Sequence, residues 1–282
     1  MNKPVEDQLQ VAQRDIQAQG AEGLLDARVY SHGGTRKKTD RLMVFFHGGG
    51  FVDGDLDEGD QFLSRLVALV PDYVILSSRY TLAGEKPFPA AVEDAHAVLM
   101  WAKKNKASIG WSGKSMVVAG IEAGANLAAV CALMSRDRGA PKLAGQVLIM
   151  PMLDPGLSTC SMREVAPGAE TLEVANSCAA SYRGYLPNAA DRSHPYASPL
   201  QSSRLRNLPP ALILSAEDDP LRDEAEQYGA KLTSSGVSTT MKRLAPDSIQ
   251  DAAARNECAC EAAALTEIAR FLTALDGSLT TS

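Results

Sequence analysis

The fold of this chain is decided by the stretch Arg41-Leu42-Met43-Val44-Phe45-Phe46-His47-Gly48-Gly49-Gly50-Phe51. Its apolar run is typical of a strand that is covered on both faces of a sheet. Three glycines follow shortly after, and a backbone without Cβ atoms can turn sharply and approach a ligand closely. The stretch therefore predicts a buried strand whose carboxyl end leads into a glycine-rich loop at a binding site.

The rest of the chain continues this alternation of buried strands and amphipathic helices. Parallel strands need long crossover connections, and helices on both faces of the sheet bury them. We therefore predict an α/β fold with a mostly parallel central sheet, in one domain spanning residues 1–282, with ligands bound at the carboxyl ends of the strands. The expected strands are 24–31, 41–46, 72–78, 115–119, 145–150, 211–215 and 239–244, and the expected helices include 89–105, 126–138 and 258–275.

Two segments are expected to cover the site as a lid. Val5, Leu9, Ala12 and Ile16 recur at steps of three and four residues, which predicts an amphipathic N-terminal helix within residues 1–20. Residues 156–196 break the strand and helix rhythm with Gly, Pro, Ser and small polar residues, and we interpret them as an insertion.

Composition narrows the class of ligand. The net charge of −6 and the pI near 5.3 argue against nucleic acid and anionic membrane surfaces, which attract basic proteins. The five cysteines lack the spacing of a zinc site, so neither a metal nor another cofactor is expected. The chain starts without a signal-peptide pattern and has no uncharged apolar run of about eighteen residues, which predicts no membrane span and a cytoplasmic location.

The glycine-rich stretch at His47–Phe51 resembles the HGGG oxyanion loop of the hormone-sensitive-lipase family of carboxylesterases. Further segments are similar to family segments and occur in the family's order, namely 80–94, 136–146, 195–200 and 219–224. The likeness extends over about residues 40–275 and implies the α/β-hydrolase fold. It implies a small acyl or ester-like ligand, or an apolar one, and allows a homodimer formed through an edge strand or the last helix.

The resemblance also implies where the active-site residues lie. The oxyanion hole would consist of the backbone N–H groups of Gly48, Gly49 and Ala123. The family's nucleophilic serine is replaced by Glu122 in Gly120-Ile121-Glu122-Ala123-Gly124, and its catalytic histidine is replaced by Gln250. The triad acid matches Asp219, so the three triad-equivalent positions are Glu122, Asp219 and Gln250.

These replacements favour a protein without ordinary esterase turnover. A serine nucleophile needs an adjacent base, and a glutamine amide does not carry protons near neutral pH. The leading hypothesis is a catalytically degenerate, small-molecule-binding pseudoenzyme. The alternative is a hydrolase or lyase that uses Glu122 as base or nucleophile. An engineered inactive esterase fits less well, because Ile121 and Ala125 also depart from the family pattern.

Glu122 is expected to fold into its own oxyanion hole and to accept hydrogen bonds from Gly48, Gly49 or Ala123. Gln250 is expected to lie between Glu122 and Asp219 and to donate to both carboxylates. The histidines His47, His96 and His194 are interpreted as structural, with His47 positioning the glycine turn.

Overall fold

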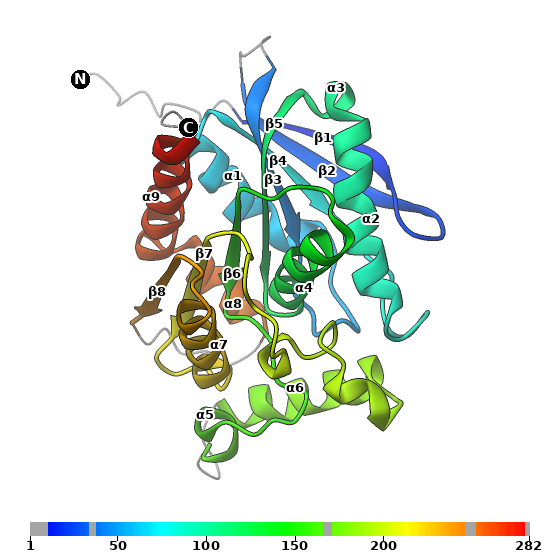
Figure 1. Cartoon of the computed structure of the whole chain (residues 1–282), viewed down its shortest axis with the longest axis vertical. Coiled ribbons are helices and arrows are strands. Elements are labelled where there is room, and N and C mark those ends of the chain that lie inside the picture. Colours follow the sequence, from blue (N-terminus) through cyan, green and yellow to red (C-terminus); the bar gives the residue numbers. More distant parts are fainter. Residues whose placement is uncertain (1–10, 34–37, 166–170, 246–251, 280–282) are drawn as a thin grey trace, which may run out of the picture.

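The computed structural model describes residues 11–33, 38–165, 171–245 and 252–279 (Figure 1). These residues contain an eight-stranded sheet with the order β1-β2-β4-β3-β5-β6-β7-β8. Strands β3, β4, β5, β6, β7 and β8 are parallel to one another. Strand β2 pairs antiparallel with both β1 and β4. The strands are β1 (Val11–Gln19), β2 (Leu24–His32), β3 (Thr39–Phe46), β4 (Tyr73–Ser78), β5 (Trp111–Ile121), β6 (Gly145–Ile149), β7 (Ala211–Ala216) and β8 (Thr239–Leu244).

Helices cover both faces of the sheet, as the sequence predicts. Helices α2, α4 and α7 pack on one face, and α1, α8 and α9 pack on the other. Helices α5 and α6 lie beyond one end of the sheet (Figure 1). The helices are α1 (Asp60–Leu69), α2 (Ala90–Lys104), α3 (Lys106–Ile109), α4 (Ala123–Arg138), α5 (Cys160–Arg163), α6 (Thr171–Tyr185), α7 (Arg222–Ser234), α8 (Ala252–Cys260) and α9 (Ala262–Leu279), with short 3-10 turns at Asp57–Gly59, Ala189–Ser193 and Pro199–Gln201.

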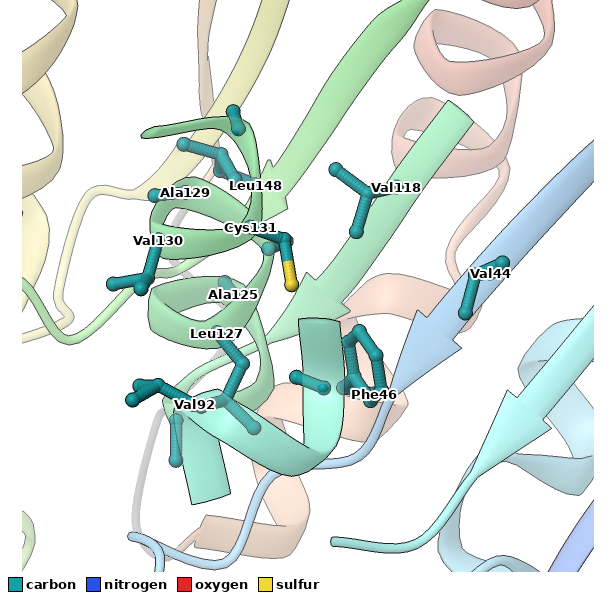
Figure 2. Packing of buried hydrophobic residues seen from close by; sticks show 14 of the residues in the cluster. Val44, Phe46, Val92, Val118, Ala125, Leu127, Ala129, Val130, Cys131 and Leu148 are labelled. Atoms are coloured by element: carbon teal, nitrogen blue, oxygen red, sulfur yellow. The ribbon is translucent and has the colours of Figure 1, made fainter. Parts of the chain in front are cut away.

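Strand β3 shows how the apolar run is buried. Val44 and Phe46 belong to the hydrophobic cluster beneath α4, whereas Phe45 belongs to the cluster beneath α1 and α9. Figure 2 shows Val44 and Phe46 on the same side of the sheet as the α4 side chains Leu127 and Cys131. Successive strand residues point to opposite faces, so a strand covered on both faces must be apolar at every position.

The predicted N-terminal helix is wrong for the residues that the structure describes. Val11–Gln19 forms strand β1, which pairs with β2 along its whole length. The turn between them is closed by a hydrogen bond from Gly20 N to Gly23 O at 2.8 Å. A spacing of four residues, as between Ala12 and Ile16, fits one face of a strand as well as one turn of a helix, because four is an even number. Val5 and Leu9 lie outside the described residues.

The insertion at 156–196 contains α5 and α6 and packs on the glycine-rich loop. The ring of Phe51 stacks on that of Tyr185 with centroids 3.7 Å apart. A Cβ atom on Gly50 would lie 2.2 Å from Ser181 Oγ, so α6 approaches the loop as closely as glycine allows. The N-terminal residues 11–19 make no such contact, because β1 lies at the far edge of the sheet.

The C-terminal helix predicted at 258–275 is divided into α8 and α9 at Glu261. No helix within the described residues has the length and apolar character that a bilayer crossing requires.

Candidate active site

The strand register brings together the loops that follow β3, β5 and β7. Phe46 at the end of β3 pairs with Gly120 near the end of β5, and Ile121 pairs with Ile149 of β6. The glycine-rich loop therefore lies beside Glu122, and the chain after β7 leads to Asp219. This edge holds the carboxyl ends of the parallel strands, where α/β sheets bind ligands.

Glu122 lies in a strained elbow between β5 and α4. Its φ of 54° and ψ of −113° are unusual for a residue with a side chain. The tight turn depends on two glycines: a Cβ atom on Gly120 would lie 2.2 Å from the carbonyl carbon of Gly124, and a Cβ atom on Gly124 would lie 2.0 Å from Phe46 O. Backbone bonds from Glu122 N to Ile149 O and from Met152 N to Glu122 O hold the turn. The sequence-predicted elbow is therefore present with glutamate at its apex.

The glycine-rich loop is held rigidly by its neighbours. Gly49 has a φ of 87°, and a Cβ atom there would lie 2.1 Å from Asp53 O. Tyr80 donates its hydroxyl proton to Gly48 O at 2.8 Å, and its ring stacks on His47. Burial lowers the pKa of His47 to about 4, so the imidazole is neutral and donates from Nδ1 to Gly48 O. His47 acts in this arrangement as a support for the turn.

The Glu122 carboxylate occupies the oxyanion hole. Its Oε2 accepts hydrogen bonds from Gly49 N at 2.7 Å and from Gly50 N at 3.2 Å. The expected bond with Gly49 is therefore present. Within the described residues Gly50 is the second donor, rather than Gly48 or Ala123, because the loop curls through three consecutive residues of positive φ, 49–51, and turns both N–H groups toward one oxygen. Gly48 still touches the carboxylate, since a Cβ atom there would lie 2.9 Å from Oε2.

Arg255 on α8 bridges Glu122 and Asp219. Its Nη1 donates to Glu122 Oε1 at 3.2 Å, while Nε and Nη2 donate to the two oxygens of Asp219 at 2.9 Å each. The Arg255 side chain is only 2% exposed. Burial acts to lower the pKa of Arg255, but attraction to the two carboxylates outweighs it and the pKa is raised. A charged guanidinium is thus enclosed between two buried carboxylates.

Both oxygens of Asp219, one of which orients the histidine in a triad, already accept hydrogen bonds from other groups within the described residues. Its Oδ1 accepts from Leu221 N as well as from Arg255 Nη2, and its Oδ2 accepts from Arg255 Nε. Gln250, which the sequence places between the two carboxylates, lies outside the described residues. The bridge that the structure describes is made by Arg255, which sequence reasoning missed. Arg255 could have been found from charge alone. Two buried carboxylates need a cation, and Arg255 is the first basic residue after Gln250.

A cavity of about 650 Å³ opens in front of Glu122 and Arg255. Helix α6 contributes Ser177 and Ser181 to its wall. Burial and the nearby carboxylates of Asp55, Asp53 and Glu122 raise the pKa of Glu58 in the same wall. The remaining lining mixes polar side chains with glycine and apolar residues. The other lining residues are Gly48, Gly49, Gly50, Val52, Asp53, Gln61, Ile121, Asn256, Glu257 and Cys260.

The other histidines of the sequence analysis lie away from this cavity. His96 on α2 contacts Ala140 O at 2.9 Å through Nε2, and His194 Nδ1 accepts a hydrogen bond from Tyr196 N. Neither lines the cavity. The described residues contain no cluster of three or more His, Cys, Asp or Glu arranged to hold a metal ion.

A glycine-rich loop after β3, a strained elbow after β5 and an acid after β7 define the site of an α/β-hydrolase. The family model for the alpha/beta hydrolase fold matches residues 43–247. An arylesterase of Saccharolobus solfataricus is 32% identical over 231 residues, which cover 82% of this chain and 74% of the relative. Carboxylesterase NlhH of Mycobacterium tuberculosis is 35% identical over 239 residues, covering 83% and 73% of the two chains.

Solved structures agree with these relatives. The hyperthermophilic esterase from Pyrobaculum calidifontis superposes with a TM-score of 0.82 at 35% identity, and the match covers 96% of this chain and 87% of that one. The chain belongs to the hormone-sensitive-lipase-like carboxylesterase family of the α/β-hydrolase superfamily.

Proposed function

We propose that this chain is a non-hydrolytic member of its esterase family that binds a small molecule in the cavity beside Glu122. One observation carries the proposal: Arg255 joins Glu122 and Asp219 into a buried ion triad that engages both the residue at the elbow and the triad acid.

Each requirement of ester hydrolysis is either missing or engaged by a particular contact. The N–H groups of Gly49 and Gly50, which would stabilise an oxyanion, already bind the Glu122 carboxylate. The elbow offers no hydroxyl nucleophile. Both oxygens of Asp219 accept hydrogen bonds from Arg255, so an imidazole would have to compete with the guanidinium for the acid. If only the serine were lost, the oxyanion-hole donors and the triad acid would remain usable. In this structure both are bound to other groups.

The alternative function uses Glu122 as a base or nucleophile. The retained strained elbow and the esterase names of the relatives favour it, because that geometry presents a side chain to a substrate. Against it, Glu122 Oε2 faces the glycine N–H groups and Oε1 faces Arg255, so both oxygens are bound to donors. A reaction through Glu122 would have to proceed with the carboxylate bound to these donors, or after some of them had been released.

The cavity wall supports a polar small molecule, or an ester-like one with a polar part. Ser177 and Ser181 of α6 close one side, which supports a lid role for the insertion at 156–196. Continuous hydrophobic layers on both faces of one sheet support the proposal of a single domain. A homodimer and a cytoplasmic location remain predictions.

Stepwise restoration of the triad tests the proposal. We expect the unmodified chain to leave p-nitrophenyl acetate and butyrate uncleaved above the rate of a Glu122→Ala variant. The double variant Glu122→Ser, Gln250→His should stay nearly inactive, because Arg255 still occupies Asp219. Adding Arg255→Met should release Asp219 and raise the cleavage rate by at least about tenfold over the double variant, a modest share of what a working base contributes.

Two results would contradict the proposal. One is turnover by the unmodified chain that Glu122→Gln abolishes, which would favour the alternative function. The other is full esterase activity in the double variant with Arg255 in place, which would show that the guanidinium does not block the acid.

A further inference from the structure

A second cavity lies near the end of helix α4 that is remote from Glu122, and it carries only positive charge. Its volume is about 420 Å³, and no carboxylate is among its lining residues. Arg136, in the last turn of α4, lines it together with Arg204 and Arg206. At 1.5 Å per helical residue, Arg136 lies about 20 Å along α4 from the elbow. We call this site the arginine cavity; it is unusual in a chain whose net charge is −6.

Arg136 holds the loop that forms the cavity. Its Nη1 donates to the carbonyl oxygens of Arg204 at 2.6 Å and Arg206 at 3.2 Å, and its Nη2 pairs with Asp137 at 2.7 Å. Arg136 is therefore a positioning residue whose own charge is largely balanced by Asp137. The contact fixes the backbone that carries the other two arginines.

Arg204 and Arg206 project away from the protein interior. Leu205 lies between the two arginines and Leu208 follows them. Both leucines are buried and anchor the loop in the core. Both arginines are exposed, and within the described residues neither side chain makes a hydrogen bond or an ion pair. Like charges that line one cavity repel each other, and Asp137, which pairs with Arg136 and also attracts Arg204, offsets only part of this cost. An anionic ligand would offset it.

The remaining walls supply neutral hydrogen-bond donors. The hydroxyl groups of Ser203 and Ser235 and the side-chain amide of Asn207 line the same cavity. Guanidinium groups bind phosphate oxygens with two parallel hydrogen bonds, and hydroxyl or amide donors complete such sites. We propose that the arginine cavity binds a phosphate group, either as free phosphate or as part of a phosphorylated small molecule.

An adjoining depression gives room for the rest of a larger ligand. It has a volume of about 410 Å³, shares Arg136 and Arg204 with the arginine cavity, and is also lined by Tyr196. The tyrosine hydroxyl donates at 2.9 Å to Asp137, which also lines this depression, and this bond fixes the ring beside the arginine cavity. This inference is independent of the function proposed for the Glu122 cavity.

Calorimetric titration of the full chain at constant ionic strength tests the inference. The probes are inorganic phosphate, glycerol 3-phosphate and adenosine monophosphate, with glycerol as the uncharged control. We expect saturable binding of at least one phosphate probe and none of glycerol. Arg204→Gln, Arg206→Gln should weaken that binding by about tenfold or more, since each charge-assisted contact to phosphate is strong.

The control is Arg183→Gln, Arg192→Gln, which removes two exposed arginines that do not line the arginine cavity. It should change the affinity by less than about twofold, because distant exposed charges are screened. The single variant Arg206→Gln provides an intermediate step if the double variant folds poorly, as judged by circular dichroism.

The outcomes separate the two sources of phosphate. Binding of inorganic phosphate at least as tight as that of the esters indicates free phosphate, and tighter binding of an ester indicates a phosphorylated small molecule. Absence of saturable binding by all three probes, or equal weakening in both double variants, would overturn the inference.

Discussion

Two buried acidic sites in this protein balance their charge in different ways. Glu122 and Asp219 share the guanidinium of Arg255. Glu224, on the neighbouring helix α7, is fully buried and accepts hydrogen bonds from the backbone N–H groups of Leu153 and Asp154. Its Oε2 has no hydrogen-bond partner among the described residues. Burial raises the pKa of Glu224 well above its ordinary value, although those N–H groups oppose the shift.

The comparison shows two solutions to the cost of burying a carboxyl group. At the first site a cation at hydrogen-bond distance balances two carboxylates, whereas at the second site burial favours the protonated, neutral form of the carboxyl group. In the first solution, the burial of each of the three charged residues, Glu122, Asp219 and Arg255, depends on the other two. The second makes stability depend on pH.

The largest effect is expected from Arg255→Met. This change leaves Glu122 and Asp219 buried without their cation, which costs about 3–5 kcal/mol in comparable buried pairs. Urea denaturation at pH 7 measures the loss. Arg270→Met, at an exposed arginine, should change the free energy of unfolding by less than about 0.5 kcal/mol. Equal stability of the two variants would show that Arg255 is not what balances the site.

Glu122→Gln is expected to cost less, about 1–3 kcal/mol. The neutral amide keeps one acceptor for Gly49 and Gly50 but turns donor hydrogens toward Arg255, while the pair of Arg255 with Asp219 remains. The same denaturation experiment checks this value. A gain in stability would mean that the glutamate charge is poorly balanced in the native protein.

Glu224→Gln should stabilise the protein at alkaline pH by about 1 kcal/mol or more. The unfolded chain releases the Glu224 proton near the ordinary pKa of 4.5, but the folded chain holds it to a higher pH. The stability that Glu224 contributes is therefore complete below pH 4.5 and is lost as the pH rises above that value. Unfolding free energies at pH 5, 7 and 8.5, each compared with the native chain, should show a gap that widens with pH. A gap that does not change with pH would contradict the protonated state.

The smallest effect is expected at an exposed ion pair. Arg243 pairs with Glu226 at 2.7 Å and with Glu217 at 3.1 Å, and its side chain is 45% exposed. Arg243→Gln should lower the midpoint of thermal unfolding by about 1 °C or less, and the change should shrink in high salt. Thermal unfolding at low and high salt measures it. If Arg243→Gln lowered the stability of the protein as much as Arg255→Met, buried and exposed ion pairs would not differ in their contribution.

Most strands could be predicted from the sequence because their burial is a local pattern. The run at 41–46 and the strand at 211–215 are apolar at nearly every position, and both lie in the interior of the sheet. The edge strand β1 could not be predicted in this way. Its burial is partial, and its partner β2 supplies the hydrogen bonds that favour a strand over a helix.

The sequence by itself determined the strands of the sheet other than β1, the glycine-dependent elbow and the presence of a glutamate at its apex, since tight turns and apolar runs depend on neighbouring residues. Only the tertiary structure decided that Arg255 neutralises that glutamate and that Arg204 and Arg206 join Arg136 in one cavity. Charges interact through space, so residues far apart in the chain become partners only after packing has brought them within a few ångströms.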